Sequence, residues 1–119
     1  MKVQVRNVDG ISIIDCSGEV DLYSSTHLRK ALLAQVQSSF PSVLVNMSDV
    51  TYIDSSGIAT LVEGLQLSRQ TKTRFGLYGL RANARSVLEL ARLDRVFNIF
   101  GSEQEALQKI GSVKPFDGL

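Results

Sequence analysis

The chain has 119 residues and a mass of 13.0 kDa, which is enough for one domain and too little for a second independent core. Hydrophobic residues make up 44% and charged residues 21%, a balance typical of folded proteins that excludes intrinsic disorder. The formal net charge of +1 gives no overall field that would favour nucleic acid or an anionic membrane. We expect one domain at 1–112, followed by a C-terminal tail at 113–119.

The compartment is predicted from two further features of the sequence. The N-terminal residues alternate in polarity and form no apolar segment of the kind found in secretory signals, and no apolar run approaches the length of a membrane span. Cys16 is the single cysteine and has no partner for an internal disulfide, which fits a reducing environment. These features predict a cytoplasmic protein without membrane insertion.

The elements follow from polarity patterns and turn residues. Asp9-Gly10 separates two alternating segments and predicts a hairpin, whereas 18–21 and 48–54 are interpreted as loops. The expected elements, in order, are strands at 3–8 and 11–16, a helix capped by Ser24 or Ser25 and ending at 36, a buried strand at 43–47, a helix at 55–70, a strand at 75–80, a helix at 83–90, a strand at 96–100 and a helix from Ser102.

This order predicts an α/β fold, because strands that alternate with helices form right-handed crossovers in a parallel sheet. The N-terminal hairpin adds an antiparallel strand, so we expect a mixed sheet with a parallel core. The helices are expected to pack mostly on one side of it.

The sequence holds none of the common catalytic signatures for nucleotide binding, serine hydrolysis, redox or zinc chemistry. A serine nucleophile would need His27, which is expected on the exposed face of a helix. Cys16 lies among apolar strand residues and is interpreted as a small buried hydrophobe. We therefore predict that the protein is not an enzyme and has no catalytic, metal-binding or cofactor-binding residues.

The segment Asp54-Ser55-Ser56-Gly57 follows a buried strand and opens a helix, where α/β sheets place functional loops. Asp54 is expected to be the N-cap, which leaves both serines at the first exposed positions of the helix. A phosphate there would meet backbone N–H groups and the positive end of the helix dipole. The same four residues are also a good helix start with no further role, and spacing alone leaves both interpretations open.

Three parts of the chain together resemble the STAS domain family, which includes the bacterial anti-sigma-factor antagonists. The resemblance covers about residues 3–110 and rests on Gly18-Glu19-Val20-Asp21, on Val43-Leu44-Val45 followed by Asp49-Val50-Thr51-Tyr52-Ile53-Asp54-Ser55-Ser56-Gly57, and on Leu90-Ala91-Arg92-Leu93-Asp94-Arg95-Val96-Phe97.

The resemblance implies a binding protein that is switched by serine phosphorylation. Ser56 would accept phosphate from a partner that is both serine kinase and anti-sigma factor, and a phosphatase would reverse the reaction. Asp54 would shape the loop and support phosphorylation. The implied partner-binding residues are Asp21, Tyr23, Ser24, Ser25, Asp54, Ser55, Ser56 and Gly57. Asn46 departs from the pattern, because many family members have aspartate there.

A second interpretation is equally compatible with a small single STAS domain. Such domains also serve as cytoplasmic subunits of lipid-transporting ABC complexes, where Ser55 and Ser56 would contact the permease or ATPase without phosphate. Neither interpretation involves direct contact with nucleic acid. Residues 69–95 have a net charge of +5, which is either a solvated basic rim or a docking surface for an acidic partner.

Overall fold

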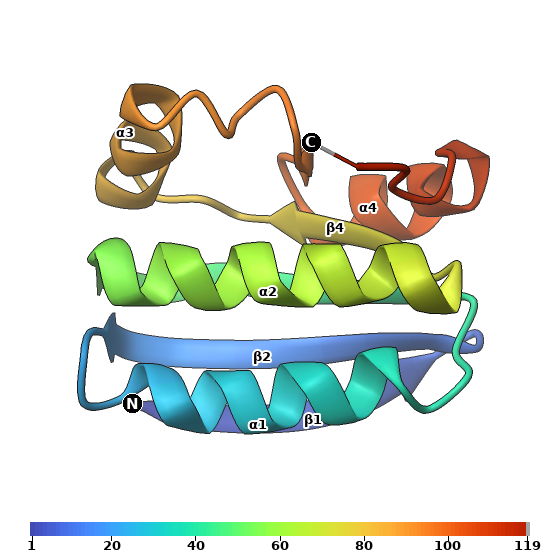
Figure 1. The fold of residues 1–119 in the computed structure, drawn as a ribbon, viewed down its shortest axis with the longest axis horizontal. Coiled ribbons are helices and arrows are strands. Elements are labelled where there is room, and N and C mark those ends of the chain that lie inside the picture. Colours follow the sequence, from blue (N-terminus) through green and yellow to red (C-terminus); the bar gives the residue numbers. More distant parts are fainter. Residues whose placement is uncertain (119) are drawn as a thin grey trace.

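Alternating residues at the N-terminus form the expected hairpin, and the rest of the chain follows the expected order of elements. The computed structural model of the protein describes residues 1–118. Its elements are β1 (Lys2–Val8), β2 (Ile11–Val20), α1 (Ser25–Val36), β3 (Ser42–Ile53), α2 (Ser55–Thr71), β4 (Arg74–Tyr78), α3 (Ala82–Leu90), β5 (Asn98–Phe100) and α4 (Glu103–Lys109), with a 3-10 turn at Ile110–Ser112 (Figure 1).

The five strands form one mixed sheet in the order β1-β2-β3-β4-β5. β1 pairs antiparallel with β2 through Asp9 and Gly10, whose φ angles of 52° and 80° are those of a type I′ turn. The other three pairs are parallel, because each crossover contains a helix. The predicted α/β class and the mixed sheet are confirmed.

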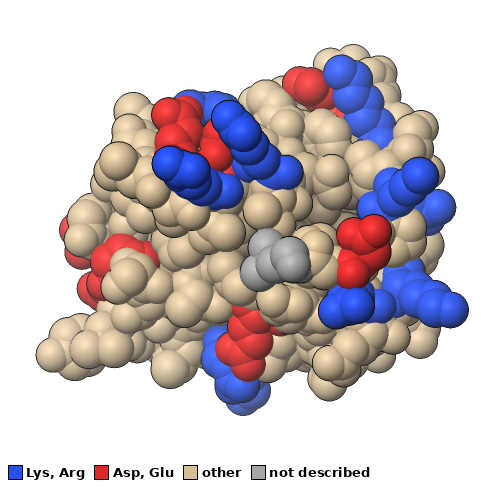
Figure 2. All heavy atoms as spheres, turned by 45° about the horizontal axis from the view of Figure 1, so that its top comes forward, with Lys and Arg blue, Asp and Glu red and all other residues tan. Residues whose placement is uncertain are grey.

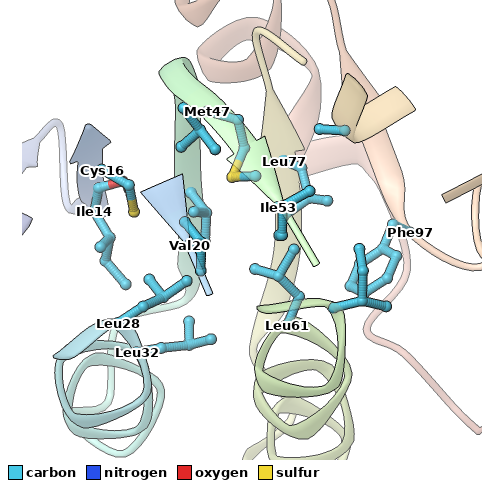
Figure 3. Packing of buried hydrophobic residues seen from close by; sticks show 14 of the residues in the cluster. Ile14, Cys16, Val20, Leu28, Leu32, Met47, Ile53, Leu61, Leu77 and Phe97 are labelled. Carbon is cyan, nitrogen blue, oxygen red and sulfur yellow. The ribbon is translucent and has the colours of Figure 1, made fainter. Parts of the chain in front are cut away.

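The sheet has a buried cluster on each face. The larger one joins the strands to α1, α2 and α3, and Figure 3 shows Leu28, Leu32 and Leu61 facing strand residues such as Val20 and Ile53. The smaller cluster joins strand residues such as Ile13 and Leu44 to Ala106 and Ile110 of the α4 region. Three helices therefore cover one face and α4 the other, as predicted.

Two expected loops are strand instead. β2 continues through Gly18 to Val20, and β3 continues to Ile53, with Gly18 opposite Val50 and Val20 opposite Ile53. The β2–β3 register shifts twice along this stretch, which breaks the two-residue alternation by which a strand is recognised in sequence. The long strands carry the two candidate functional segments to the same end of the sheet.

Smaller differences concern single residues and short segments. Ser24 stands at the N-cap position of α1, but its side chain makes no capping bond. β5 begins at Asn98, two residues later than expected. The tail is partly anchored, because Arg74 donates from Nε to the Val113 carbonyl oxygen at 2.9 Å and Phe116 packs against the larger cluster. Within residues 1–118, no helix is long and apolar enough to cross a membrane.

Candidate functional site

The start of α2 is fixed by the Asp54 carboxylate. Its Oδ1 accepts from the backbone N–H of Ser56 at 2.9 Å and of Gly57 at 3.2 Å, so the expected N-cap is confirmed. The Asp54 N–H donates to the Val20 carbonyl oxygen at 3.1 Å, which fastens the junction to the end of β2. Ser55 is exposed and Ser56 is half-buried at the first turn.

Gly57 is buried, and its role differs from that of the serines before it. A Cβ atom at this position would lie 2.5 Å from Cγ1 of Ile53 and 2.8 Å from Cγ1 of Val20. The absence of a side chain therefore lets α2 approach the ends of both strands. Gly57 faces the core, so a side chain there would press on the strands and not on a partner.

The loop between β2 and α1 is held by Asp21 in an analogous way. Its Oδ1 accepts from the N–H of Tyr23 at 3.0 Å and of Ser24 at 2.9 Å, and the Ser24 hydroxyl donates to the Glu19 carbonyl oxygen at 2.7 Å. Hydrogen bonds from the Ser24 backbone and side chain lower the pKa of Asp21. The carboxylate is therefore charged at neutral pH and holds the loop in one shape.

This loop presents apolar side chains to solvent. Leu22 is 65% exposed and Tyr23 is 85% exposed. Ser25 differs, because it is only 7% exposed and its hydroxyl donates to the Leu22 carbonyl oxygen at 3.5 Å. Of the serines predicted in this loop, Ser24 is partly accessible and Ser25 belongs to the interior.

The two loops lie at the same end of the sheet, where β2 and β3 finish, because these strands are parallel neighbours. Glu19 stands opposite Tyr52 and Val20 opposite Ile53, so the chain leaves both strands at the same level. Figure 1 shows the starts of α1 and α2 side by side at this end of the sheet. The structure thus brings together the residues around Asp21 and those around Asp54.

Two residues that help to form this end of the sheet were not predicted from the sequence. Asn83, at the start of α3, accepts from the Ile53 N–H through its Oδ1 at 2.8 Å and so holds the end of β3. Tyr52 is an exposed aromatic residue two positions before Asp54. Tyr52 lies inside the quoted motif, whereas no local signal marks Asn83, since its partner is 30 residues away.

Asn46 lies on the face of the sheet that α4 covers. Its Nδ2 donates to Asp15 Oδ1 at 2.8 Å, and Asp15 in turn pairs with Arg6, whose guanidinium also binds Glu103 of α4. The departure at Asn46 therefore belongs to a polar network that joins the sheet to α4. It does not change the charge next to Ser56.

Cys16 is buried and is the single cysteine of the chain. Burial, and to a lesser extent the nearby charge of Asp15, raises the pKa of the Cys16 thiol to about 12, so this thiol stays protonated and unreactive at neutral pH. Among the described residues, no three His, Cys, Asp or Glu side chains gather as metal ligands would. The predicted role of Cys16 as a buried hydrophobe agrees with its position.

Known proteins resemble the chain over most of its length. The anti-sigma-F factor antagonist RsfB of Mycobacterium tuberculosis is 25% identical over 105 residues, which are 88% of this chain and 85% of the relative. The anti-sigma-B factor antagonist of Listeria monocytogenes is also 25% identical, over 88% of this chain and 91% of its own.

The fold agrees with these sequence relationships. The crystal structure of an anti-sigma factor antagonist from Mycobacterium paratuberculosis superposes with a TM-score of 0.84 at 27% identity, covering 92% of this chain and 93% of the other. The family model for the STAS domain matches residues 2–106, which include every strand and both loops at the candidate site. The chain therefore belongs to the STAS domain family.

Proposed function

We propose that this protein is a cytoplasmic anti-sigma-factor antagonist that binds an anti-sigma factor kinase and is switched off by phosphorylation of Ser56. Binding would use the switch face, defined as the exposed or half-buried residues Asp21, Tyr23, Ser24, Asp54, Ser55 and Ser56. Ser25 and Gly57, which are buried, would shape the two loops from beneath.

The observation that carries the proposal is the geometry of the Asp54 cap. A hydroxyl that is to be phosphorylated on a folded protein must be held where a kinase can reach it. Asp54 fixes the N–H groups of Ser56 and Gly57, and so places Ser56 in the first turn of a regular 17-residue helix. The names of the relatives above support a role in binding anti-sigma factors.

The same geometry suggests how a phosphate would act. The Asp54 carboxylate already accepts from two N–H groups of the first turn, so a Ser56 phosphate would add about −1.5 to −2 charges beside an existing charge. The free domain tolerates this, since the helix N-terminus and the surrounding water stabilise the anion. A docked partner would face repulsion and desolvation and would be released.

The proposal is tested with an anti-sigma factor serine kinase from the organism that produces this protein. Incubation with that kinase and ATP should add one phosphate, which tandem mass spectrometry assigns to Ser56. Ser56→Ala should abolish the reaction, and the neighbouring variant Ser55→Ala is the matched control that should still be modified. Phosphate on Ser55, or none on the folded wild type, would contradict the assignment.

The transporter role has less support, because the relatives described above are named as anti-sigma factor antagonists. It predicts a different result in a co-purification experiment. A subunit of an ABC complex would co-purify with a permease and ATPase, and its assembly would be independent of phosphate.

A further inference from the structure

The edge of the sheet formed by β1 is uncovered. β1 is the first strand in the sheet order and pairs only with β2, so its outer backbone N–H and C=O groups have no strand partner. Proteins commonly protect such an edge with charged side chains. Here the Arg6 guanidinium turns away to Asp15, with Nε 2.6 Å from Oδ2, which leaves Lys2 as the exposed charged side chain of β1.

An apolar groove runs beside this edge. It has a volume of about 420 Å³ and lies between β1 and α1. Its apolar lining comes from Met1, Val3 and Val5 on one side and from Ala31 and Ala34 on the other. Val5 is 45% exposed, which is high for a valine in a strand. Small alanines on the helix leave room for further side chains above the strand.

The charged groups around the groove have one sign. Lys30 of α1 lines it, together with the N-terminal residue Met1 and the polar side chain of His27, and no carboxylate is part of the lining. Lys2 and Lys30 take part in none of the ion pairs within residues 1–118. β1 and α1 of a second copy would offer no carboxylate to these cations, because neither element contains Asp or Glu, which disfavours a second copy of the chain as the occupant.

We propose that the β1 edge and this groove bind an extended, acidic segment of a partner protein by strand addition. Backbone hydrogen bonds to β1 would hold the segment, as in other cases of strand addition. Alternate side chains of the segment would enter the groove, the apolar ones against Val3, Val5 and Ala31, and an acidic one beside Lys30. This surface is separate from the switch face and does not depend on phosphorylation.

The test uses three blocked seven-residue peptides and the full chain. The first has valine at positions 1, 3 and 5, glutamate at position 7 and threonine between them, so that the valines and the glutamate share the face that enters the groove. The second has lysine in place of the glutamate, and the third is the first with its backbone amides methylated. NMR titration and amide hydrogen exchange should show that the first peptide binds at β1 and protects the β1 amides that β2 leaves unpaired. The lysine peptide and the methylated peptide should bind at least about tenfold more weakly, since one has the wrong charge and the other lacks donors.

Variants of the chain locate the binding. Lys30→Glu should weaken binding of the acidic peptide about tenfold. Val5→Glu should weaken it by the same factor, because it places a carboxylate in the groove. Lys72→Glu, at an exposed lysine between α2 and β4, is the matched control and should bind normally. Ser56→Asp should also bind normally, so the result does not depend on the switch.

Three outcomes would overturn this inference. Equal binding of the acidic and methylated peptides would exclude strand addition, and equal weakening by Lys72→Glu would show a non-specific charge effect. Self-association in analytical ultracentrifugation that Val5→Glu abolishes would make a second copy the occupant.

Discussion

The Asp54 carboxylate stabilises the helix start and shapes the surface next to Ser56. It satisfies two N–H groups that the helix itself leaves without partners, while the backbone N–H of Asp54 ties α2 to β2. The stability of the helix start and the position of Ser56 therefore both depend on the Asp54 side chain.

Replacing Asp54 should reduce stability and phosphorylation together. Asp54→Ala should lower the free energy of unfolding by about 0.5–2 kcal/mol, measured by urea denaturation, because the cap is lost. It should also slow phosphorylation of Ser56. Asp54→Asn is the control, since asparagine caps helices as well as aspartate does. An equal loss of stability in Asp54→Asn would show that charge, and not the cap, stabilises this turn.

Gly57 is the second residue at which a single substitution is informative. Helix propensity alone predicts that Gly57→Ala gains up to about 1 kcal/mol. The added Cβ would overlap Ile53 and Val20, however, and overpacking costs about 1–3 kcal/mol. We expect a net loss of stability in thermal melting. Gly111→Ala, where a Cβ would have no neighbour within 4 Å, is the control and should stay close to wild type. A Gly57→Ala protein that melts higher than wild type would contradict this packing.

Between elements, the network around Arg6 attaches α4 to the sheet. Arg6 of β1 binds both Asp15 of β2 and Glu103 of α4, and the Tyr78 hydroxyl of β4 donates to Glu103 Oε1 at 2.7 Å. Hydrogen bonds from Arg6 and Tyr78 lower the pKa of Glu103 below its usual 4.5. For Asp15, burial opposes ionisation, but hydrogen bonds from Arg6 and Asn46 outweigh it and lower the pKa.

This network should make stability depend on pH in the acid range. A carboxylate whose pKa is lowered by folding contributes fully above its unfolded pKa, and the contribution is lost as pH falls through the folded pKa. Glu103→Gln should therefore lower the free energy of unfolding by about 1 kcal/mol at pH 7, and the difference from wild type should shrink as pH falls below 4.5.

The control for the network is an ion pair at the surface. Glu63 pairs with Arg29 between α1 and α2 at 2.6 Å, with side chains that are 42% and 53% exposed. Glu63→Gln should cost less than Glu103→Gln, since exposed pairs contribute about 0–1 kcal/mol. If Glu103→Gln lowers the free energy of unfolding as much at pH 3 as at pH 7, the loss comes from packing and not from the charge.

At the scale of the whole molecule, Figure 2 shows one face on which the charged side chains are spread out. Figure 2 shows Lys and Arg in several separate groups on one face, some of them next to Asp or Glu. Within the basic stretch 69–95, Arg81 lies 3.9 Å from Asp49 and donates to the Ser48 carbonyl oxygen at 2.8 Å. The Lys and Arg side chains seen on this face do not form one continuous basic patch.

The proposed switch should separate binding from stability in the whole protein. Ser56→Asp, which adds one charge beside Asp54, should weaken binding to the anti-sigma kinase in titration calorimetry, and a loss of 3 kcal/mol would be more than about a hundredfold. Ser56→Ala should bind almost as well as wild type. Both variants should melt near wild type, because Asp54 and not Ser56 caps the helix. Equal kinase affinity of all three forms would contradict the switch.

The sequence by itself determined the order of elements, the fold class and the helix start at Asp54. These follow from local rules: apolar residues repeat with the period of a helix or a strand, and Asp, Ser and Gly mark turns and caps. The Asp9-Gly10 turn and the Asp54 cap both involve atoms only a few residues apart, so short segments were enough to predict them.

Only the tertiary structure decided where β2 and β3 end, which serines are accessible and how α4 is attached. The ends of β2 and β3 depend on pairing between residues more than 30 positions apart, such as Val20 and Ile53, and register shifts hide it from local patterns. The family resemblance implies that Ser25 and Gly57 contact a partner, but packing buries both. Arg6 and Glu103 are 97 residues apart in the sequence. No local signal predicts which carboxylate of the chain an arginine will pair with.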